Sequence, residues 1–545
     1  MELRPAVDNP VVSVTLDRPE QTEGHDLQSE HANRLRLGRT LLDDVIWQTA
    51  RSQGPEVSLN RLERFLQESS IPRALCLWLG LHDSATPRPD RAEITRRLSR
   101  DIARIDELLT SQINAILHHQ SFQKLEASWR GLSYLVKKLP DNDSIKIRVL
   151  NISWAELVQD QTRALEFDQS QLFRKIYDAE FGHPGGQPFG VLLGDYEIHL
   201  RPGSDHPYDD LEALSKISGV AAAAFAPYIT GVHPSFFGLD SFTDLERPLS
   251  LSRAFEQVDY LKWRSFRLSE DARFVGLTLP RMLMRLPHDP ESPGGRRLRF
   301  REDVEGPDRS KYLWGSAVYA FGSVLIRGFV NSGWMADIRG VRQGISEQGV
   351  KGCLDEGGLV TGLPAHSFGT DRLGLALKSS TEVIVTDARE KELDELGFIP
   401  LCHCQDTEFS AFYTTASIQK PVKYDDPRAT ANARISAMLQ YILCVSRFAH
   451  YVKVIGRDKI GSQSSPEDCE RLLSEWLRKY TISSDTAGTE ERAKYPLREA
   501  KVVVRERPDK PGCYNCVIHL RPHFQLDQMF MSMKLTTELA PGRPD

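Results

Sequence analysis

The feature that most constrains the fold is a run of alternating residues near the C-terminal end of the chain. Between Met529 and Leu539 one face is built from methionine, leucine and threonine, and the other face is mostly polar. A period of two is the pattern of a β-strand with one face against a core. The backbone of such a strand also needs hydrogen-bond partners. The segment therefore predicts a strand that has to join a sheet.

Two further β-prone runs precede this strand. Lys501–Arg507 and Cys513–Leu520 flank Pro508-Asp509-Lys510-Pro511-Gly512, a turn signal between two strands. The C-terminal end of the chain is therefore predicted to be rich in β-structure.

The rest of the chain mixes helical and strand patterns. From Arg91 to Lys138 apolar residues recur at spacings of three and four, with a break near His118–Ser121, which indicates helices. Phe189–Leu193 predicts a buried strand that ends at Gly194-Asp195-Tyr196. We expect a mixed α/β (α+β) fold with several domains. Further strands are predicted at Val11–Leu16, Ile145–Leu150, Phe274–Leu279 and Thr381–Thr386, and further helices at Phe167–Ala179, Leu211–Pro227, Tyr312–Gly328, Ala431–Val454 and Pro466–Tyr480.

Composition shifts suggest four regions. Residues 1–37 form a polar, flexible tail, and residues 38–90 hold a helical segment and a linker. Residues 91–425 form the main body, and residues 426–545 form a C-terminal domain. Within the second region, residues 40–52 predict an amphipathic helix with Thr40 as its N-cap.

Charge and hydropathy exclude several classes of protein. The net charge of the 545 residues is −6, which disfavours a strongly basic nucleic-acid binder. The longest uncharged apolar stretch, Tyr312–Ile326, has 15 residues, whereas a membrane-spanning helix needs about 20. We therefore expect a buried core helix there and no insertion into a membrane. No secretory leader is visible and the eight cysteines are scattered, so we expect a reducing cytoplasm.

The motifs of several enzyme classes are absent from the sequence. No phosphate-binding Gly-x-x-x-x-Gly-Lys-Ser/Thr run, His-Glu-x-x-His helix or Gly-x-Ser-x-Gly elbow occurs. We therefore predict no catalytic residues and no cofactor. One alternative stays open: a soluble α/β enzyme of unknown reaction that uses Asp195, Glu197 or His199, close to the end of a predicted strand.

Metal and nucleic-acid sites are weaker candidates. Cys402-His403-Cys404 and the pair Cys513 and Cys516 offer zinc-type ligands, but small buried cysteines are the commoner case. His118 and His119 lie within a helical run, where surface or packing roles are more usual. The basic run Arg296–Arg301 could contact phosphates, yet acidic residues follow at once. We predict no metal site and no nucleic-acid partner.

Several ordered motifs resemble one known family. They are similar to motifs of the large subunit of the type VI secretion contractile sheath, the TssC/VipB family, and the similarity runs from about Arg91 to Leu539. The motifs are Trp129-Arg130-Gly131-Leu132 within Phe122–Val136, Phe189–Glu197, Phe236–Leu239, Pro280–Pro287, Leu313–Gly315, Ser446–Tyr451, Arg457–Gly461, Pro496–Ala500 and Leu520–Leu526.

The resemblance implies a structural role without catalysis. In that family the large subunit and a small subunit (TssB/VipA) stack into a helical sheath around an inner tube of Hcp hexamers. Contraction on a baseplate propels the tube and its effectors out of the cell, and a ClpV-type AAA+ unfoldase recycles the contracted sheath. For this chain the resemblance implies the same partners, including further copies of itself.

The resemblance also assigns two interaction segments. The helix at residues 40–52, with Leu41, Leu42, Val45 and Ile46, is similar to the segment that the unfoldase recognises. The strand at residues 526–539 corresponds to one that shares a sheet with neighbouring subunits. Its apolar face is Met529, Met531, Met533, Leu535 and Leu539, and the three methionines replace residues that are more often aliphatic in the family.

Overall fold

The computed structural model of the chain contains two compact units. The larger unit comprises Met1–Pro19, Gln120–Leu286 and Glu305–Asp545, and the smaller comprises Glu20–His119 and Pro287–Val304. The structure describes residues 11–16, 64–79, 90–141, 144–183, 185–289, 300–304, 308–341, 343–345, 351–353, 356–368, 378–404, 407, 409–459, 466–484, 488–506, 514–523 and 533–539.

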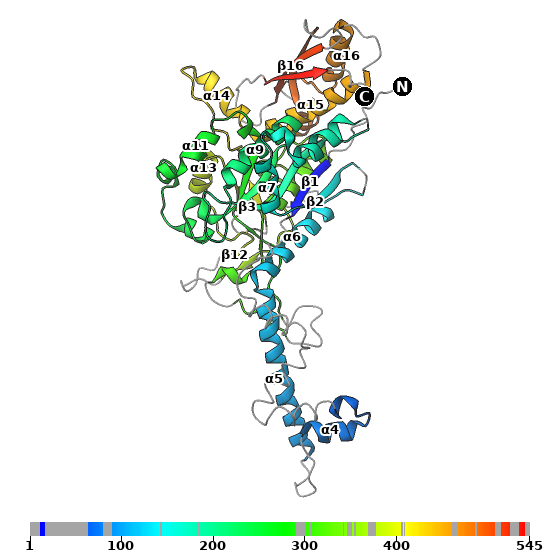
Figure 1. Cartoon of the computed structure of the whole chain (residues 1–545), viewed down its shortest axis with the longest axis vertical. Coiled ribbons are helices and arrows are strands. Elements are labelled where there is room, and N and C mark those ends of the chain that lie inside the picture. The colour runs from blue at the N-terminus through cyan, green and yellow to red at the C-terminus, as the bar shows by residue number, and fades with distance from the viewer. Residues whose placement is uncertain are drawn as a thin grey trace. The chain divides into compact units, whose positions relative to one another are not determined.

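The larger unit is built on an eight-stranded sheet with the order β10-β14-β13-β5-β4-β3-β1-β2. Figure 1 labels β1, β2 and β3 of this sheet. From β13 to β2 each strand runs parallel to its neighbours, and β14 and β10 add an antiparallel end. The strands are β1 Val11–Leu16, β2 Lys146–Asn151, β3 Phe189–Ile198, β4 Tyr228–Val232, β5 Val275–Leu279, β10 Leu359–Val360, β13 Ile399–His403 and β14 Ser410–Phe412.

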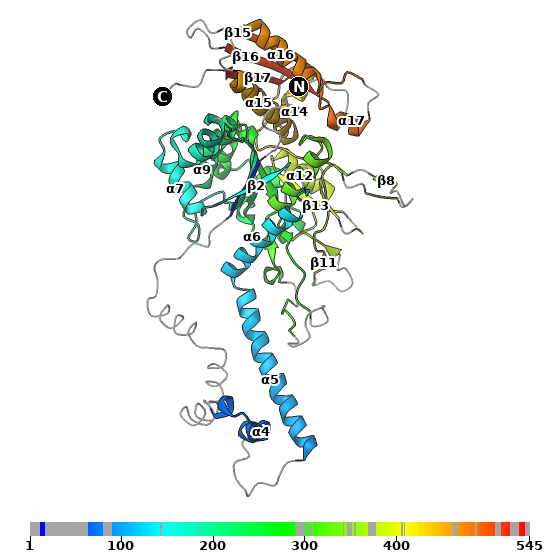
Figure 2. The same cartoon turned by 90° about the vertical axis from the view of Figure 1, so that its right-hand side faces the viewer.

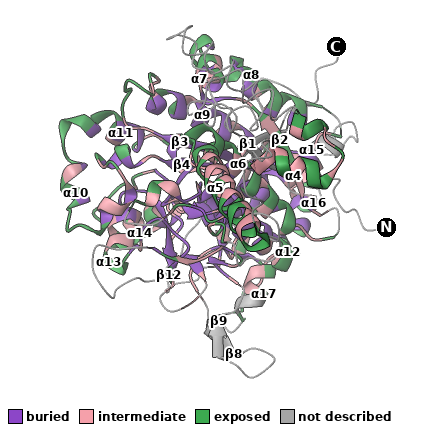
Figure 3. Cartoon of the chain, turned by 90° about the horizontal axis from the view of Figure 1, so that it is seen from below, coloured by how far each residue is buried: buried purple, intermediate pink, exposed green. Residues whose placement is uncertain are grey.

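Both faces of the central strands are buried. In β3, Leu192 and Tyr196 belong to the same core as helix α9 (Asp210–Ala224), whereas Val191 and Leu193 belong to the core that contains helix α12 (Val318–Ser332). Figure 2 shows these helices on opposite sides of the sheet, and Figure 3 shows the central strands as mainly buried. Burial on two faces explains why this strand is a continuous apolar run without alternation.

The end of β3 differs from the prediction. The strand continues to Ile198, so Gly194, Asp195 and Tyr196 lie within it and do not end it. The parallel ladder supplies the reason, because Glu197 and Ile198 still pair with residues of β4 after a register shift.

Helix α6 (Gln120–Lys137) contacts α12 through a glycine. A Cβ atom at Gly131 would lie 2.3 Å from Cε2 of Tyr319, a fully buried ring. The glycine of the Trp-Arg-Gly-Leu motif therefore permits a close approach between two helices. Close packing of this kind leaves no room for an added methyl group.

Two other predicted elements begin or break differently. The helix predicted from Tyr312 begins only at Val318, because Trp314–Gly315 forms strand β7 and pairs with β6 (Met282–Leu283). The helix predicted at Ala431–Val454 is two helices, α14 (Pro427–Ser436) and α15 (Leu439–Lys459). They separate where Ala437 O accepts a hydrogen bond from Ser417 N and where Met438 forms a bridge with Ala416.

The predictions at Thr381–Thr386 and Phe167–Ala179 are wrong in detail. Thr381 makes only an isolated bridge, and its hydroxyl donates to Val383 O at 2.8 Å. Such local bonds compete with a strand ladder despite β-branched composition. Residues of the second segment fall into η1 (Phe167–Gln169), α8 (Gln171–Phe173) and a π-helix, η2 (Arg174–Gly182).

A separate antiparallel sheet forms the C-terminal part of the larger unit. It has the order β15-β16-β17, from Leu497–Glu506, Tyr514–Pro522 and Met533–Leu539. One face of β15 and β16 packs on α15 and on α16 (Pro466–Arg478) in a core that includes Phe448, Trp476 and Ile518. The predicted strand pair is confirmed, and residues 507–513 between the two strands lie outside the described residues.

The smaller unit contains helices α4 (Ile71–Leu79) and α5 (Arg91–Leu117). Asp90 caps α5, and Trp78 Nε1 donates to Asp101 Oδ2 at 2.9 Å. Asn114 Oδ1 of α5 accepts a hydrogen bond from Asp303 N at 3.1 Å. The predicted helices with a break near 118–121 are confirmed by the end of α5 and the start of α6.

The remaining elements are short. They are α7 Trp154–Arg163, α10 Leu251–Ala254, α11 Leu261–Phe266, α13 Asp387–Glu395, α17 Thr489–Lys494, η3 Pro234–Phe237, η4 Phe242–Glu246, η5 Val258–Tyr260, η6 Asp271–Phe274, η7 Arg309–Lys311, β8 Gln343–Ile345, β9 Lys351–Cys353, β11 His366–Ser367 and β12 Lys378–Ser379.

Within the described residues, no helix combines the length and the hydropathy that crossing a bilayer requires. The most apolar candidate from the sequence, Tyr312–Ile326, contributes α12 to the core of the larger unit. The expectation of a buried helix is therefore confirmed from Val318 onward.

The contact between Gly131 and Tyr319 gives a stability prediction. We expect Gly131→Ala to lower the free energy of unfolding by about 1–3 kcal/mol, because the added methyl group overlaps a buried ring. This loss outweighs the gain of about 1 kcal/mol in helix propensity. Urea unfolding of the full-length chain measures the difference. Gly203→Ala, at a position where an added Cβ meets no atom within 4 Å, is the control; equal stability of the two variants would contradict the prediction.

Candidate functional site

The carboxyl ends of the parallel strands bring polar side chains together. Glu197 lies near the end of β3, His233 follows β4, and Arg281 lies just beyond β5. This edge of a parallel sheet is where α/β enzymes usually bind ligands. It is therefore the first place to test the enzyme alternative.

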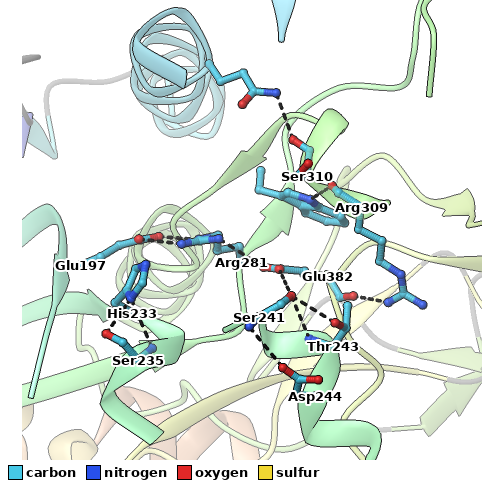
Figure 4. Close-up of polar contacts among 12 residues, drawn as sticks. Glu197, His233, Ser235, Ser241, Thr243, Asp244, Arg281, Arg309, Ser310 and Glu382 are labelled. Atoms are coloured by element: carbon cyan, nitrogen blue, oxygen red, sulfur yellow. Dashed lines mark hydrogen bonds and ion pairs between the residues drawn. The ribbon is translucent and has the colours of Figure 1, made fainter. Parts of the chain in front are cut away.

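An ion pair joins the ends of β3 and β5. Arg281 Nε donates to Glu197 Oε1 at 2.5 Å, and Arg281 Nη2 donates to Oε2 at 2.7 Å (Figure 4). The planar fork of a guanidinium matches a carboxylate in this bidentate geometry. Although burial alone raises the pKa of Glu197, Arg281 outweighs this effect and lowers the pKa to about 2. Glu197 is thus an ionised partner of a fixed cation.

A second carboxylate faces the same arginine. Glu382 Oε2 lies 3.7 Å from Arg281 Nη1, and Glu382 Oε1 accepts a hydrogen bond from Ser241 Oγ at 3.2 Å. Arg309 Nη1 donates to the carbonyl oxygen of Glu382, as Figure 4 shows. Burial raises the pKa of Glu382, and Arg281 offsets this only in part. Together these contacts tie the strand ends to the segment that holds Glu382.

His233 lies beside this network and is neutral at physiological pH. Its Nδ1 lies 2.8 Å from Ser235 Oγ. Burial lowers the pKa of His233 to about 4, and the nearby Glu197 only partly counteracts this. The neutral His233 ring caps η3, because its Nδ1 accepts a hydrogen bond from the backbone N–H of Ser235.

The three residues of the enzyme alternative do not converge. Asp195 Oδ2 accepts from Ser128 Oγ of α6 at 2.5 Å, Glu197 is held by Arg281, and His199 lies against Asp210 at the start of α9. Each side chain therefore joins β3 to a different element. Glu197 also lies within β3 and not after it, which corrects the position inferred from the sequence.

The structure does bring His199, His206 and Asp210 together. Asp210 is 1% exposed, and its two carboxylate oxygens face the two imidazoles. Burial alone raises the pKa of Asp210, but the contacts with His199 and His206 outweigh it and lower the pKa. The sequence pattern did not single out His206 or Asp210, because a loop and not a regular spacing brings them to His199.

Two of the cysteines proposed as metal ligands, Cys402 and Cys516, are buried in the protein core. Cys402 and His403 are buried in β13, and burial raises the pKa of the Cys402 thiol. Cys516 is buried in the C-terminal core, where burial raises the pKa of its thiol to about 12. Its predicted companion, Cys513, lies outside the described residues. In the part of the chain that the structure describes, the one group with metal-ligand geometry is His199, His206 and Asp210.

Other candidates belong to the smaller unit or lie outside the described residues. His118 Nε2 lies 3.5 Å from Glu302 Oε1 within the smaller unit, which agrees with a packing role. Of Arg296–Arg301 only Phe300 and Arg301 are described, so the nucleic-acid alternative stays untested by the geometry. Leu41, Leu42, Val45, Ile46, Met529 and Met531 also lie outside the described residues.

The remaining residues of the predicted shared strand lie in β17. The backbone register places Leu535 opposite Ile518 and Leu539 opposite Tyr514 of β16. The strand therefore pairs with its own chain on one side. Among the described strands, β15 and β17 each have a sheet neighbour on one side alone.

The chain matches known sheath proteins over most of its length. The family model described as EvpB/VC_A0108, tail sheath N-terminal domain, matches residues 99–419. The model described as EvpB/VC_A0108, tail sheath gpW/gp25-like domain, matches residues 428–539.

A curated relative supports the same assignment. The chain is 42% identical over 445 residues to a protein of Pseudomonas aeruginosa named Type VI secretion system sheath protein TssC1. The match covers 81% of this chain and 86% of the relative. The resemblance inferred from the ordered motifs is confirmed: the chain belongs to the VipB (EvpB/VC_A0108) family of type VI secretion tail sheath proteins, as a large sheath subunit.

Proposed function

We propose that the chain assembles with a small sheath subunit and with further copies of itself into a helical sheath in the cytoplasm. The sheath encloses an inner tube of Hcp hexamers, stands on a baseplate and contracts to propel the tube and its effectors. The observation that carries this proposal is the family match, which spans both the body and the C-terminal sheet. Head-to-tail contacts that do not close on themselves generate helical polymers of this kind.

The C-terminal sheet supports a specific mode of assembly. Strands β15 and β17 are the outer strands of this sheet within the described chain. The outer edge of β15 is partly covered, because Leu497 N donates to Tyr480 O and Val504 N donates to Glu470 Oε2. The outer edge of β17 has no described strand beside it, and such an edge offers backbone groups to another strand. We propose that the segment 526–539, with Met529, Met531, Met533, Leu535 and Leu539, joins sheets between neighbouring subunits. Pairing across an edge gives affinity through backbone hydrogen bonds and alternate side chains give specificity.

A shared sheet beside a rigid body suits a contractile polymer. The parallel sheet with its two cores forms a body that can reorient as a whole. In the assembly that we propose, the hydrogen bonds between subunits persist at the edge strands during this movement. Rigid-body reorientation about an interface needs two packings that differ by only a few kcal/mol per subunit. Contraction then proceeds without nucleotide hydrolysis if the contracted lattice buries more surface than the extended lattice does.

We also propose that the chain is not an enzyme. The polar groups at the carboxyl edge of the sheet support this reading, because Glu197, Arg281 and Glu382 hold one another. In this proposal assembly stores the energy for contraction, and a separate ATPase disassembles the contracted sheath so that its subunits can assemble again. We propose that a ClpV-type AAA+ unfoldase recognises the segment 40–52 through Leu41, Leu42, Val45 and Ile46.

Truncation tests the shared strand. We expect removal of Gln525–Asp545 to abolish tubular polymers when the chain is co-expressed with the small subunit, because β16 then lacks β17 and the inter-subunit strand is gone. Negative-stain microscopy of the purified complex is the measurement. Removal of Ala540–Asp545 alone, beyond β17, is the matched control and should leave tubes intact. Contractile tubes from the longer truncation would refute the assembly mode.

Paired charge substitutions test the recycling segment. We expect Leu42→Asp with Ile46→Asp to remove binding of the unfoldase to contracted sheaths, because two carboxylates replace the apolar face of the predicted helix. Co-sedimentation of unfoldase with contracted sheaths measures it, and tube formation should be unchanged. Asp43→Asn with Asp44→Asn, on the same segment, is the control. Undiminished unfoldase binding by the first variant would rule the segment out.

Substitution of Arg281 tests whether its ion pairs with Glu197 and Glu382 stabilise the fold. Arg281→Met leaves Glu197 and Glu382 facing each other without their cation, so we expect a loss of about 2 kcal/mol or more in the free energy of unfolding. The double variant Glu197→Gln, Arg281→Met should recover part of it. Urea unfolding of the full-length chain measures both. A single variant as stable as the wild type would show that the network holds nothing together.

A further inference from the structure

Two histidines and one aspartate meet where β3 passes into α9. His199 follows β3 directly, His206 lies in the connecting loop, and Asp210 is the first residue of α9. One ligand atom from each of the three lies within 4.8 Å of the others. His206 Nε2 is 2.7 Å from Asp210 Oδ1, and His199 Nδ1 is 3.5 Å from Asp210 Oδ2.

We propose that His199, His206 and Asp210 form a binding site for a divalent transition-metal ion, with Zn²⁺ as the best fit. Neither the sheath family assignment nor the proposed assembly role supplies this site or depends on it. Two imidazole nitrogens and one carboxylate oxygen are a common zinc ligand set, with a water molecule in the fourth position. Imidazole ligands disfavour Mg²⁺ and Ca²⁺, which prefer oxygen ligands.

The separation between His199 and Asp210 fits a shared ion better than a hydrogen bond. A contact of 3.5 Å is longer than a normal hydrogen bond, and His199 Nδ1 is a buried atom without a hydrogen-bond partner. Tetrahedral zinc with bonds of about 2.0–2.1 Å separates two ligand atoms by about 3.4 Å. An ion between Nδ1 and Oδ2 would therefore satisfy both atoms with little movement.

His206 has the freedom to complete the site. Its side chain is 20% exposed and comes from the loop, which gives it room to move. A metal ion lies near the plane of each imidazole that binds it, and the ring of His206 stacks on that of His199 with 22° between the planes. His206 therefore has to turn out of this stack as well as lengthen its 2.7 Å contact with Asp210. Asp210 is fixed by comparison. The loop side chain thus adjusts to a rigid carboxylate.

Outer contacts hold the carboxylate in place. Trp154 Nε1 donates to Asp210 Oδ1 at 2.7 Å, and the backbone N–H of His199 donates to Asp210 Oδ2 at 2.7 Å. Oδ2 keeps a further lone pair for an ion, whereas the second lone pair of Oδ1 faces His206 Nε2. Such outer-shell donors orient ligating carboxylates in metal sites.

Ring stacking fixes the plane of His199. The ring of His206 lies 4.1 Å from that of His199, and the ring of His233 lies 4.2 Å from it, measured between centroids. His233 itself contacts Ser235 through Nδ1, so it positions His199 and is not counted as a ligand. A bound ion would fasten the loop between the end of β3 and the beginning of α9.

Equilibrium dialysis of the full-length chain against ZnCl₂ tests the site. We expect the wild type to bind a Zn²⁺ ion that both His206→Ala and His199→Ala lose. Trp154→Phe should keep the stoichiometry and weaken binding by about tenfold, because it removes an outer-shell donor. His183→Ala, an exposed histidine that contacts Asp178 O, is the matched control and should bind as the wild type does.

Cobalt spectroscopy on the unaltered chain keeps the test decisive if a variant fails to fold. Co²⁺ in the site should give the visible absorption of a tetrahedral ion without thiolate-to-cobalt charge transfer, which separates the site from the cysteines. Wild-type protein that binds no Zn²⁺, a His206→Ala variant that binds it equally tightly, or a spectrum of thiolate-bound or aqueous Co²⁺ would each overturn the proposal.

Discussion

The larger unit depends on the burial of both faces of its parallel sheet. Strands β3 and β4 carry apolar residues on each side, and two separate cores form around α9 and α12. A parallel sheet requires this arrangement because its crossover connections cover both faces. Loss of close packing on either side, as at Gly131 against Tyr319, therefore weakens the whole body. The ion pairs of the Glu197–Arg281–Glu382 network lie towards the strand ends, outside the two apolar cores.

The C-terminal sheet follows a different rule. It packs on α15 and α16 through one face, so its strands alternate, and its outer edges have no neighbour among the described strands. An edge of this kind favours aggregation in a monomer, whereas in a polymer it is a contact surface. The same chain thus combines a closed body with an open sheet. This division supports the mode of assembly proposed above.

The sequence predicted the helices and strands that have a clear local pattern of apolar residues or a turn signal. The helices after Arg91 follow from periodicity, β3 follows from a continuous apolar run, and the C-terminal strand pair follows from two β-prone runs around a turn signal. The prediction of a strand at Thr381–Thr386 failed because threonine favours strands and can also form local hydrogen bonds through its hydroxyl group, as Thr381 does. The site was less accessible, since Glu197 and Arg281 are 84 positions apart and meet only through strand order. Asp210 likewise meets His199 only because the loop between β3 and α9 folds back, and no sequence motif predicts that conformation.

The position of β1 has a mechanical consequence. This strand precedes every other described element in the chain, yet it lies between β2 and β3, and the sheet order joins β2 to the rest through β1 alone. A pull applied ahead of Val11 would act first on a ladder in the interior of the sheet and not on a peripheral helix. Extraction of those six residues would detach β2 and uncover one side of β3. Traction on the amino end would therefore dismantle the body from within.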